Sequence, residues 1–345
     1  MSSPALALRG VSKSFGSRAA LTNVDLRLEP AEFLVVLGPT GAGKTTLLRT
    51  VAGLEQPDAG ALDLFGAEAT HLAPAERDVA LVFQNFSLYP SKTVRENLEF
   101  PLRAPGRKLG APEIAQRIEW AAKLLHIERL LDRPARKLSG GEMQRVAIGR
   151  AIVRRPKLFL MDEPLTNLDA KLREELRVEL RELARKLETP VLWVTHDSAE
   201  ALSMADRVAV LCDGAILQVG SPEDVYFRPA SPIVAGQLGT PPMNIIDVKR
   251  AANGWATASG VVIARAPSDA PSTAKIGFRP EHVALEGGEV EAVIEVVEDI
   301  GPVRVVVAQW GGANVHILVE RSRTLHPGDR IRPRVELEHV VVWRN

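Results

Sequence analysis

The chain has 345 residues, more than the roughly 250–300 that one hydrophobic core usually supports, so we expect at least two domains. Its 43 lysines and arginines balance 43 aspartates and glutamates, so no net charge favours nucleic acid or anionic lipid as a partner. The only cysteine is Cys212, which excludes an internal disulfide and a cysteine-based zinc cluster. No apolar run approaches the roughly 20 residues that span a bilayer, so any membrane attachment is expected to come from a partner.

Over about the first 230 residues, short aliphatic segments alternate with helical patterns, which predicts an α/β domain. Four segments lack the alternation of a half-exposed strand and are expected to be buried parallel strands: 32–38, 78–83, 157–162 and 190–196. Residues 95–137 carry four prolines and no strand pattern, which predicts an inserted helical subdomain. The leucines of 169–188 recur every three or four residues and predict a helix that Asp169 caps.

The segment "GPTGAGKTT" (38–46) follows a predicted strand, precedes an apolar helix and fits the phosphate-loop pattern. Glycines allow backbone N–H groups to surround phosphates, and the helix N-terminus adds a positive dipole end. We expect Lys44 to neutralise the β- and γ-phosphates and Thr45 to offer its hydroxyl to Mg²⁺. The alternative, a glycine-rich turn that matches by chance, does not explain this context.

A second part of a nucleotide site is predicted where the strand 157–162 ends. Asp162 and Glu163 are adjacent, and two neighbouring carboxylates repel each other unless a cation or a proton-transfer role keeps them together. We therefore expect Asp162 near Mg²⁺ and Glu163 as the general base that polarises the attacking water. The alternative is a solvated acidic turn before Pro164.

The segment "LSGGEMQR" (138–145) begins another helix far from the phosphate loop. Ser139 and Glu142 form the pattern of a capping box, which on its own indicates only a well-started helix. Gly140 and Gly141 weaken a first helical turn, so their presence predicts that another group approaches the backbone closely. The group that suits a helix N-terminus is a phosphate.

The composition changes after residues 207–220, which predict a hairpin that turns at Asp213-Gly214. Residues 227–244 are rich in proline and glycine and are expected to be a linker. From about residue 245 onward the short apolar segments predict a small β-barrel or β-sandwich domain.

These motifs, in this order, resemble those of the ATPase subunits of ABC transporters, and the resemblance spans nearly the whole chain. "LSGGEMQR" is similar to the family's signature motif, which in a head-to-tail dimer caps the γ-phosphate of ATP held by the other subunit. The resemblance implies that Ser139, Gly140 and Gly141 act on a partner chain's nucleotide. It also identifies Gln84 with the Q-loop, Asp169 in "TNLD" with the D-loop, and His196, by itself an ordinary strand-end residue, with the switch histidine.

The resemblance implies a complete set of site residues for ATP and Mg²⁺. Catalytic roles fall on Lys44, Gln84, Glu163 and His196, and Mg²⁺ ligands on Thr45, Gln84 and Asp162. Nucleotide contacts fall on Phe15 at the adenine-stacking position and on Gly38, Pro39, Thr40, Gly41, Ala42, Gly43, Lys44, Thr45, Thr46, Gln84, Ser139, Gly140, Gly141, Asp162 and Asp169.

Residues 221–246 and 276–283 are similar to segments of the ATPases of maltose-type and glycerol-3-phosphate-type importers. This implies a P-loop ABC ATPase domain over 1–235, with its helical subdomain at about 88–155, and an OB-fold-like regulatory domain over 236–345. The implied protein is a peripheral ATPase on the cytoplasmic face of the inner membrane that powers uptake of a sugar or sugar-derived solute. Its implied partners are a second copy, two transmembrane permease subunits and a solute-binding protein, with no nucleic acid.

Two other functions are considered. A non-transport ABC ATPase usually has two ATPase halves in one chain or a long coiled coil, and neither pattern occurs here. A regulatory binding protein, acting through residues 245–345, is compatible with transport. "YPSKTV" (89–94) departs from the family's usual "YPHMTV", so Ser91 and Lys92 are expected to alter the contact with the permease.

Overall fold

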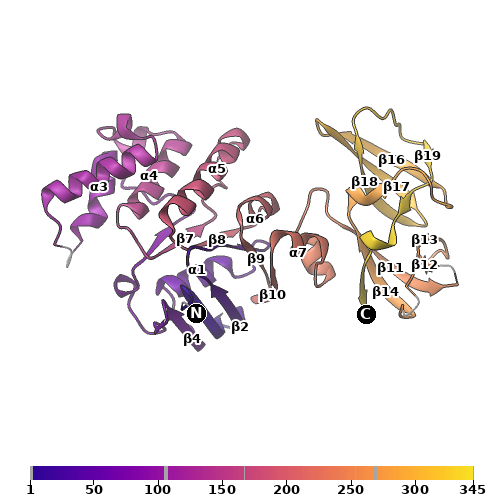
Figure 1. The fold of residues 1–345 in the computed structure, drawn as a ribbon, viewed down its shortest axis with the longest axis horizontal. Helices are drawn as coiled ribbons and strands as arrows, with labels where there is room; N and C mark the ends of the chain where they lie inside the picture. The colour runs from indigo at the N-terminus through magenta and orange to yellow at the C-terminus, as the bar shows by residue number, and fades with distance from the viewer. Residues whose placement is uncertain (1–2, 105–107, 167, 253, 268–269, 345) are drawn as a thin grey trace. The chain divides into compact units, whose positions relative to one another are not determined.

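The computed structural model describes residues 3–104, 108–166, 168–252, 254–267 and 270–344. It divides the chain into two compact units, Met1–Pro222 and Glu223–Asn345, which are described separately below (Figure 1). No helix among these residues is long and apolar enough to cross a membrane.

The first unit is built on a six-stranded sheet in the order β10-β9-β3-β8-β7-β6. The pairs within β9-β3-β8-β7-β6 are parallel, and β10 pairs with β9 in the antiparallel direction. Every residue of β3, β7 and β8 is buried, which confirms the prediction of parallel strands covered on both faces. The strands are β3 Phe33–Leu37, β6 Val79–Val82, β7 Leu158–Asp162, β8 Val191–Thr195, β9 Arg207–Cys212 and β10 Ala215–Gly220.

A second sheet, which was not predicted from the sequence, is formed by strands that lie before and after the phosphate loop along the chain. It is antiparallel, in the order β2-β1-β4-β5, with β1 Leu6–Phe15, β2 Arg18–Leu28, β4 Ala59–Leu64 and β5 Ala67–Glu68. Buried residues from this sheet, from the central sheet and from helix α1 (Lys44–Ala52) form one hydrophobic cluster. The helix after the phosphate loop is therefore held between two sheets.

Between β6 and β7 the described residues contain helices and no strand, as predicted. The helices are α2 Val94–Glu99, α3 Ala111–Leu124 and α4 Gly140–Ile152, and α3 and α4 lie together on the side of the unit away from β2 and β4 (Figure 1). Helix α5 (Ala170–Leu187) begins where the leucine pattern indicated, and the Asp169 side chain accepts a hydrogen bond from the N–H of Leu172 at 3.0 Å.

The next short helix, α6 (Ser198–Met204), carries a buried carboxyl group. Glu200 is 2% exposed, and its Oε2 accepts a hydrogen bond from the indole N–H of Trp193 at 2.9 Å. Burial raises the pKa of Glu200 above its ordinary value of 4.5, even though hydrogen bonds from Thr195 and Trp193 oppose the shift. The folded state therefore holds this proton more tightly than the unfolded state.

We expect Glu200→Gln to stabilise the first unit at neutral pH. Because the pKa of Glu200 is higher in the folded state, the free energy of unfolding of the wild type increases as the pH falls from the folded pKa to the unfolded pKa. Above the folded pKa this contribution is absent. The neutral amide avoids the cost of the buried charge, so the melting temperature should rise by about 2–4 °C at pH 8, for a gain of about 1 kcal/mol. Calorimetry at pH 8 and pH 5 tests this, and a gain that does not shrink at the lower pH contradicts it.

The second unit is all-β apart from short helices, which confirms the change in composition read from the sequence. It contains sheets in the orders β13-β12-β11-β14-β21 and β18-β17-β16-β19, and the pair β15-β20, around one buried cluster. The strands are β11 Asn244–Ala251, β12 Gly254–Ala256, β13 Val262–Ala264, β14 Thr273–Phe278, β15 Val283–Ala284, β16 Ala292–Asp299, β17 Val303–Trp310, β18 Ala313–Glu320, β19 Arg330–Ile331, β20 Arg334–Val335 and β21 Val341–Arg344.

The boundary between the units lies earlier than the predicted 235/236. Helix α8 (Pro232–Gly236) belongs to the second unit because Ala235 packs with Met243 and Trp343. Arg279, which is 1% exposed, donates hydrogen bonds to the carbonyl oxygens of Tyr226 and Leu238, both at 2.6 Å. The proline-rich segment predicted to be a linker is thus fixed to the β unit by a buried guanidinium.

Candidate functional site

The phosphate loop joins the end of β3 to the start of α1, and its glycines are required by close contacts. A Cβ added to Gly38 would lie 2.2 Å from the carbonyl oxygen of Leu211, and one added to Gly43 would lie 2.2 Å from that of Ala20. Gly41 and Gly43 also have φ angles of 82° and 107°, which L-residues with a Cβ rarely adopt. The loop is therefore held against β9 and β2 in a conformation that leaves its backbone close to any bound group.

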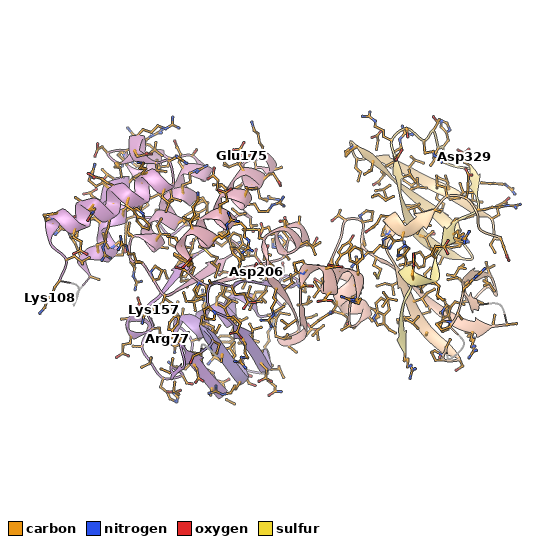
Figure 2. The ribbon with its side chains drawn as sticks, viewed as in Figure 1. Arg77, Lys108, Lys157, Glu175, Asp206 and Asp329 are labelled. Carbon is orange, nitrogen blue, oxygen red and sulfur yellow. The ribbon has the colours of Figure 1, made fainter. Side chains whose placement is uncertain are left out.

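Helix α1, which begins at the phosphate loop, is fixed at its other end by a buried cation. Arg77, which is 2% exposed, donates hydrogen bonds to the carbonyl oxygens of Thr50 and Val51 at 2.8 and 3.0 Å (Figure 2). These carbonyls belong to the last turn of α1, where the usual i+4 donors of the helix interior are missing, although the N–H of Gly53 also donates to Thr50. The anchored helix gives the loop a rigid base.

Lys44 lies at the centre of the site and is 5% exposed. Its Nζ donates hydrogen bonds to the carbonyl oxygens of Gly38 and Pro39 at 2.9 and 3.0 Å, so the side chain folds back over its own loop. The same Nζ lies 3.2 Å from Oε1 of Glu163. The ammonium group is thus positioned between the loop and the acid at the end of β7.

Asp162, the last residue of β7, faces the first turn of α1. The Thr45 hydroxyl lies 3.2 Å from Asp162 Oδ1. Burial raises the pKa of Asp162, and the neighbouring Glu163 charge adds to the rise, while the hydrogen bond from Thr45 opposes it. A hydroxyl and a carboxylate are oxygen donors of the kind that Mg²⁺ binds, and a cation beside them would relieve this unfavourable charge. The donor set fits Mg²⁺.

Glu163 is the point where side chains from four segments converge. Its backbone has a φ of 43°, in the left-handed region, and its N–H donates to the carbonyl oxygen of Val194 at 3.0 Å. Its Oε2 lies 3.0 Å from His196 Nδ1, 3.5 Å from Gln84 Nε2 and 3.4 Å from the Thr166 hydroxyl. The loop after β3 and the ends of β6 and β8 therefore bring Lys44, Gln84 and His196, the other predicted catalytic residues, to the carboxylate that follows β7.

Comparison with known proteins places this arrangement in a family. Residues 21–166 match the family model described as "ABC transporter". The chain is 43% identical to a putative ATP-binding protein of Brucella abortus and 44% identical to the sn-glycerol-3-phosphate import ATP-binding protein UgpC of Cupriavidus necator. Each alignment covers 97% of this chain and 96% of the relative. The chain belongs to the ABC transporter family of ATP-binding proteins.

Solved structures support the same assignment for the first unit. The dimeric structure of the bacterial ABC transporter cassette MJ0796 is 31% identical, with a TM-score of 0.58, and covers 63% of this chain and 98% of that one. Its post-hydrolysis form bound to ADP and Pi is 32% identical, with a TM-score of 0.57 and the same two coverages. As an ABC ATPase, this chain combines the P-loop NTPase fold with a C-terminal all-β region.

The signature helix of this ABC ATPase is capped as its sequence indicated. Glu142 Oε2 accepts from the N–H of Ser139 at 2.8 Å, and Ser139 Oγ accepts from the N–H of Glu142 at 3.4 Å. The hydrogen bond from the Ser139 N–H lowers the pKa of the Glu142 carboxyl. The two glycines differ in their surroundings. A Cβ at Gly141 would lie 2.3 Å from Leu172 Cδ2 of α5, whereas the nearest such contact at Gly140 is an ordinary 3.6 Å.

Several predicted site residues make their contacts outside the group around Glu163. Among the described residues, no hydrogen bond or ion pair joins Ser139, Gly140 or Gly141 to the group around Glu163. Asp169 is engaged as the cap of α5. Phe15 stands at the end of β1, 48% exposed, with Lys13 Nζ 5.5 Å from its ring centroid. The Thr166 hydroxyl, 3.4 Å from Glu163 Oε2, was not among the predicted site residues, although "TNLD" (166–169) contains it.

Proposed function

We propose that this ABC ATPase is the ATP-hydrolysing motor of an importer for glycerol phosphate or a related sugar-derived solute. The convergence of Lys44, Gln84 and His196 on the Glu163 carboxylate supports the hydrolytic role. The relatives named for sn-glycerol-3-phosphate import support the substrate class, since one of them aligns over 97% of this chain. Solute selectivity itself would reside in the other subunits of the importer.

In this proposal the chemistry depends on positioning and on charge neutralisation. The loop N–H groups and Lys44 hold the β- and γ-phosphates, and Phe15 stacks on the adenine. Glu163 accepts a proton from the attacking water, while His196, 3.0 Å from its Oε2, holds the carboxylate and approaches the γ-phosphate. Thr45, Asp162 and Gln84 would hold Mg²⁺, which supplies charge neutralisation for the phosphate oxygens.

We propose that two copies pair head to tail, so that Ser139, Gly140 and Gly141 of one subunit face the nucleotide of the other. The capping hydrogen bonds between Ser139 and Glu142 fix this helix start, and a helix N-terminus suits a phosphate. The dimeric structure of a neighbour with 31% identity also supports pairing. The C-terminal unit, proposed as the regulatory, OB-like part, would help to hold the pair together.

We propose that a permease subunit binds in a shallow groove of about 270 Å³ on the first unit. The Tyr89 and Phe100 rings, from residues 37% and 51% exposed, lie there tilted by 50° with centroids 4.6 Å apart, and Arg150 lies over the Tyr89 ring at 5.8 Å. Exposed aromatic rings beside a cation suit a helix end of a partner. Two permease subunits and a solute-binding protein would complete the importer and keep this chain at the cytoplasmic face of the membrane.

We expect hydrolysis to require Mg²⁺ and to stop when EDTA is added. Asp162→Asn should raise the Mg²⁺ concentration for half-maximal ATPase activity by about tenfold or more, because a carboxylate ligand is lost. Thr45→Ser, which keeps the hydroxyl, is the matched control for Thr45→Val, which removes it. Magnesium titrations of the four proteins test this, and an unchanged midpoint in both Asp162→Asn and Thr45→Val contradicts the assignment.

A further inference from the structure

The tight turn between β1 and β2 places a second cation beside the nucleotide site. Arg18 is the first residue of β2 and pairs directly with Phe15, the last residue of β1, so the two side chains share the tip of one hairpin. Arg18 Nη2 lies 3.4 Å from the carbonyl oxygen of Gly41 in the phosphate loop. Arg18 thus lies next to both the exposed Phe15 ring and the phosphate loop.

The guanidinium of Arg18 has no side-chain partner in the part of the chain that the structure describes. Among the described residues no carboxylate forms an ion pair with it, whereas its neighbour Lys13 is paired with Asp58 at 3.0 Å. Arg18 is also exposed, so its guanidinium keeps free N–H donors directed to solvent beside the loop. A lone carbonyl contact at 3.4 Å is too weak to explain a cation in this place.

We propose that Arg18 binds the α-phosphate of the nucleotide, an inference that rests on the proposed function. With the β- and γ-phosphates in the loop and adenine against Phe15, the α-phosphate must pass between them, beside the hairpin tip. Arginine forms charge-assisted hydrogen bonds with phosphate oxygens. Arg18 is then an affinity residue for ATP and ADP alike, and takes no part in water attack.

Arg18→Ala should raise the Kd of ADP and of the non-hydrolysable analogue AMP-PNP by the same factor, about tenfold, because both nucleotides carry the α-phosphate. The KM for ATP should rise in parallel while kcat at saturating ATP stays near the wild-type value. Arg18→Lys should recover part of the affinity. Arg27→Ala, another exposed arginine on the same strand, is the control and should bind as the wild type does.

Isothermal titration calorimetry with both nucleotides, and with 2′-deoxy-ADP, separates the outcomes. A wild-type Kd in Arg18→Ala overturns the proposal, as does a loss for AMP-PNP alone, which would place the guanidinium at the γ-phosphate. A loss that disappears with 2′-deoxy-ADP overturns it too, since the contact would then be to the ribose. If the wild-type chain itself binds neither nucleotide, the proposed function fails together with this inference.

Discussion

Replacing Glu163 by glutamine should lower the kcat for ATP hydrolysis by about a hundredfold or more while nucleotide binding persists. Glutamine keeps the shape of the side chain and loses the proton-accepting charge. Three neighbours, Lys44, His196 and Gln84, surround this carboxylate at 3.0–3.5 Å, so few other groups could replace it in the same position. Phosphate release measured at saturating ATP and Mg²⁺ gives the rate, and calorimetry gives the affinity.

The matched control for this variant is Glu175→Gln, which makes the same chemical change on the exposed side of α5 (Figure 2). We expect it to hydrolyse ATP at the wild-type rate. Wild-type turnover in Glu163→Gln would remove Glu163 from the role of general base. A loss of nucleotide binding in the same variant would instead show that its contact with Lys44 shapes the loop, and would contradict the separation of binding from chemistry.

Gly140→Asp should reduce hydrolysis by about a hundredfold or more, because it places a negative charge at the helix start that is proposed to face a partner's γ-phosphate. The side chain has room, since the nearest atom to a Cβ at this position is Leu168 Cδ2 at 3.6 Å. The fold and the binding of nucleotide to the variant's own phosphate loop should therefore remain intact. Gly140→Ala, which adds no charge, is the milder companion variant.

Mixing two inactive proteins tests whether the action is between chains. Lys44→Ala damages the phosphate loop and Gly140→Asp damages the signature helix, so neither homodimer has an intact site. A mixed dimer has one intact site if the helix start of one chain acts on the nucleotide of the other. Hydrolysis should therefore return on mixing, and its absence would contradict the head-to-tail arrangement.

The sequence predicted the central sheet well because four buried strands show continuous aliphatic runs. It also predicted the group at the strand ends, since Lys44, Asp162 and Glu163 follow directly from motifs with a strand before them. The antiparallel sheet of β1, β2, β4 and β5 was missed. Its strands are half-exposed, and strands from before and after the phosphate loop pair with one another and pack against helix α1. No local sequence pattern shows such a long-range pairing.

Two other features have tertiary causes. The approach of a phosphate to Gly141 stays a prediction, and the folded chain adds a close contact with Leu172, about thirty residues later in the chain. The end of the first unit was placed at residue 235, but Arg279 and Trp343 bind the preceding segment to the β unit. In both cases the deciding neighbour is distant in sequence, so only the folded chain reveals it.

The contact between Gly141 and Leu172 has a mechanical consequence. Helices α4 and α5 are fastened at two levels, by this close packing near their first turns and by the bidentate pairing of Arg145 with Glu179 farther along. Only a short segment separates Glu163, which follows the last residue of β7, from the start of α5 at Ala170. A displacement of that segment during turnover would tilt both helices as a single lever and carry the signature toward or away from the neighbouring subunit.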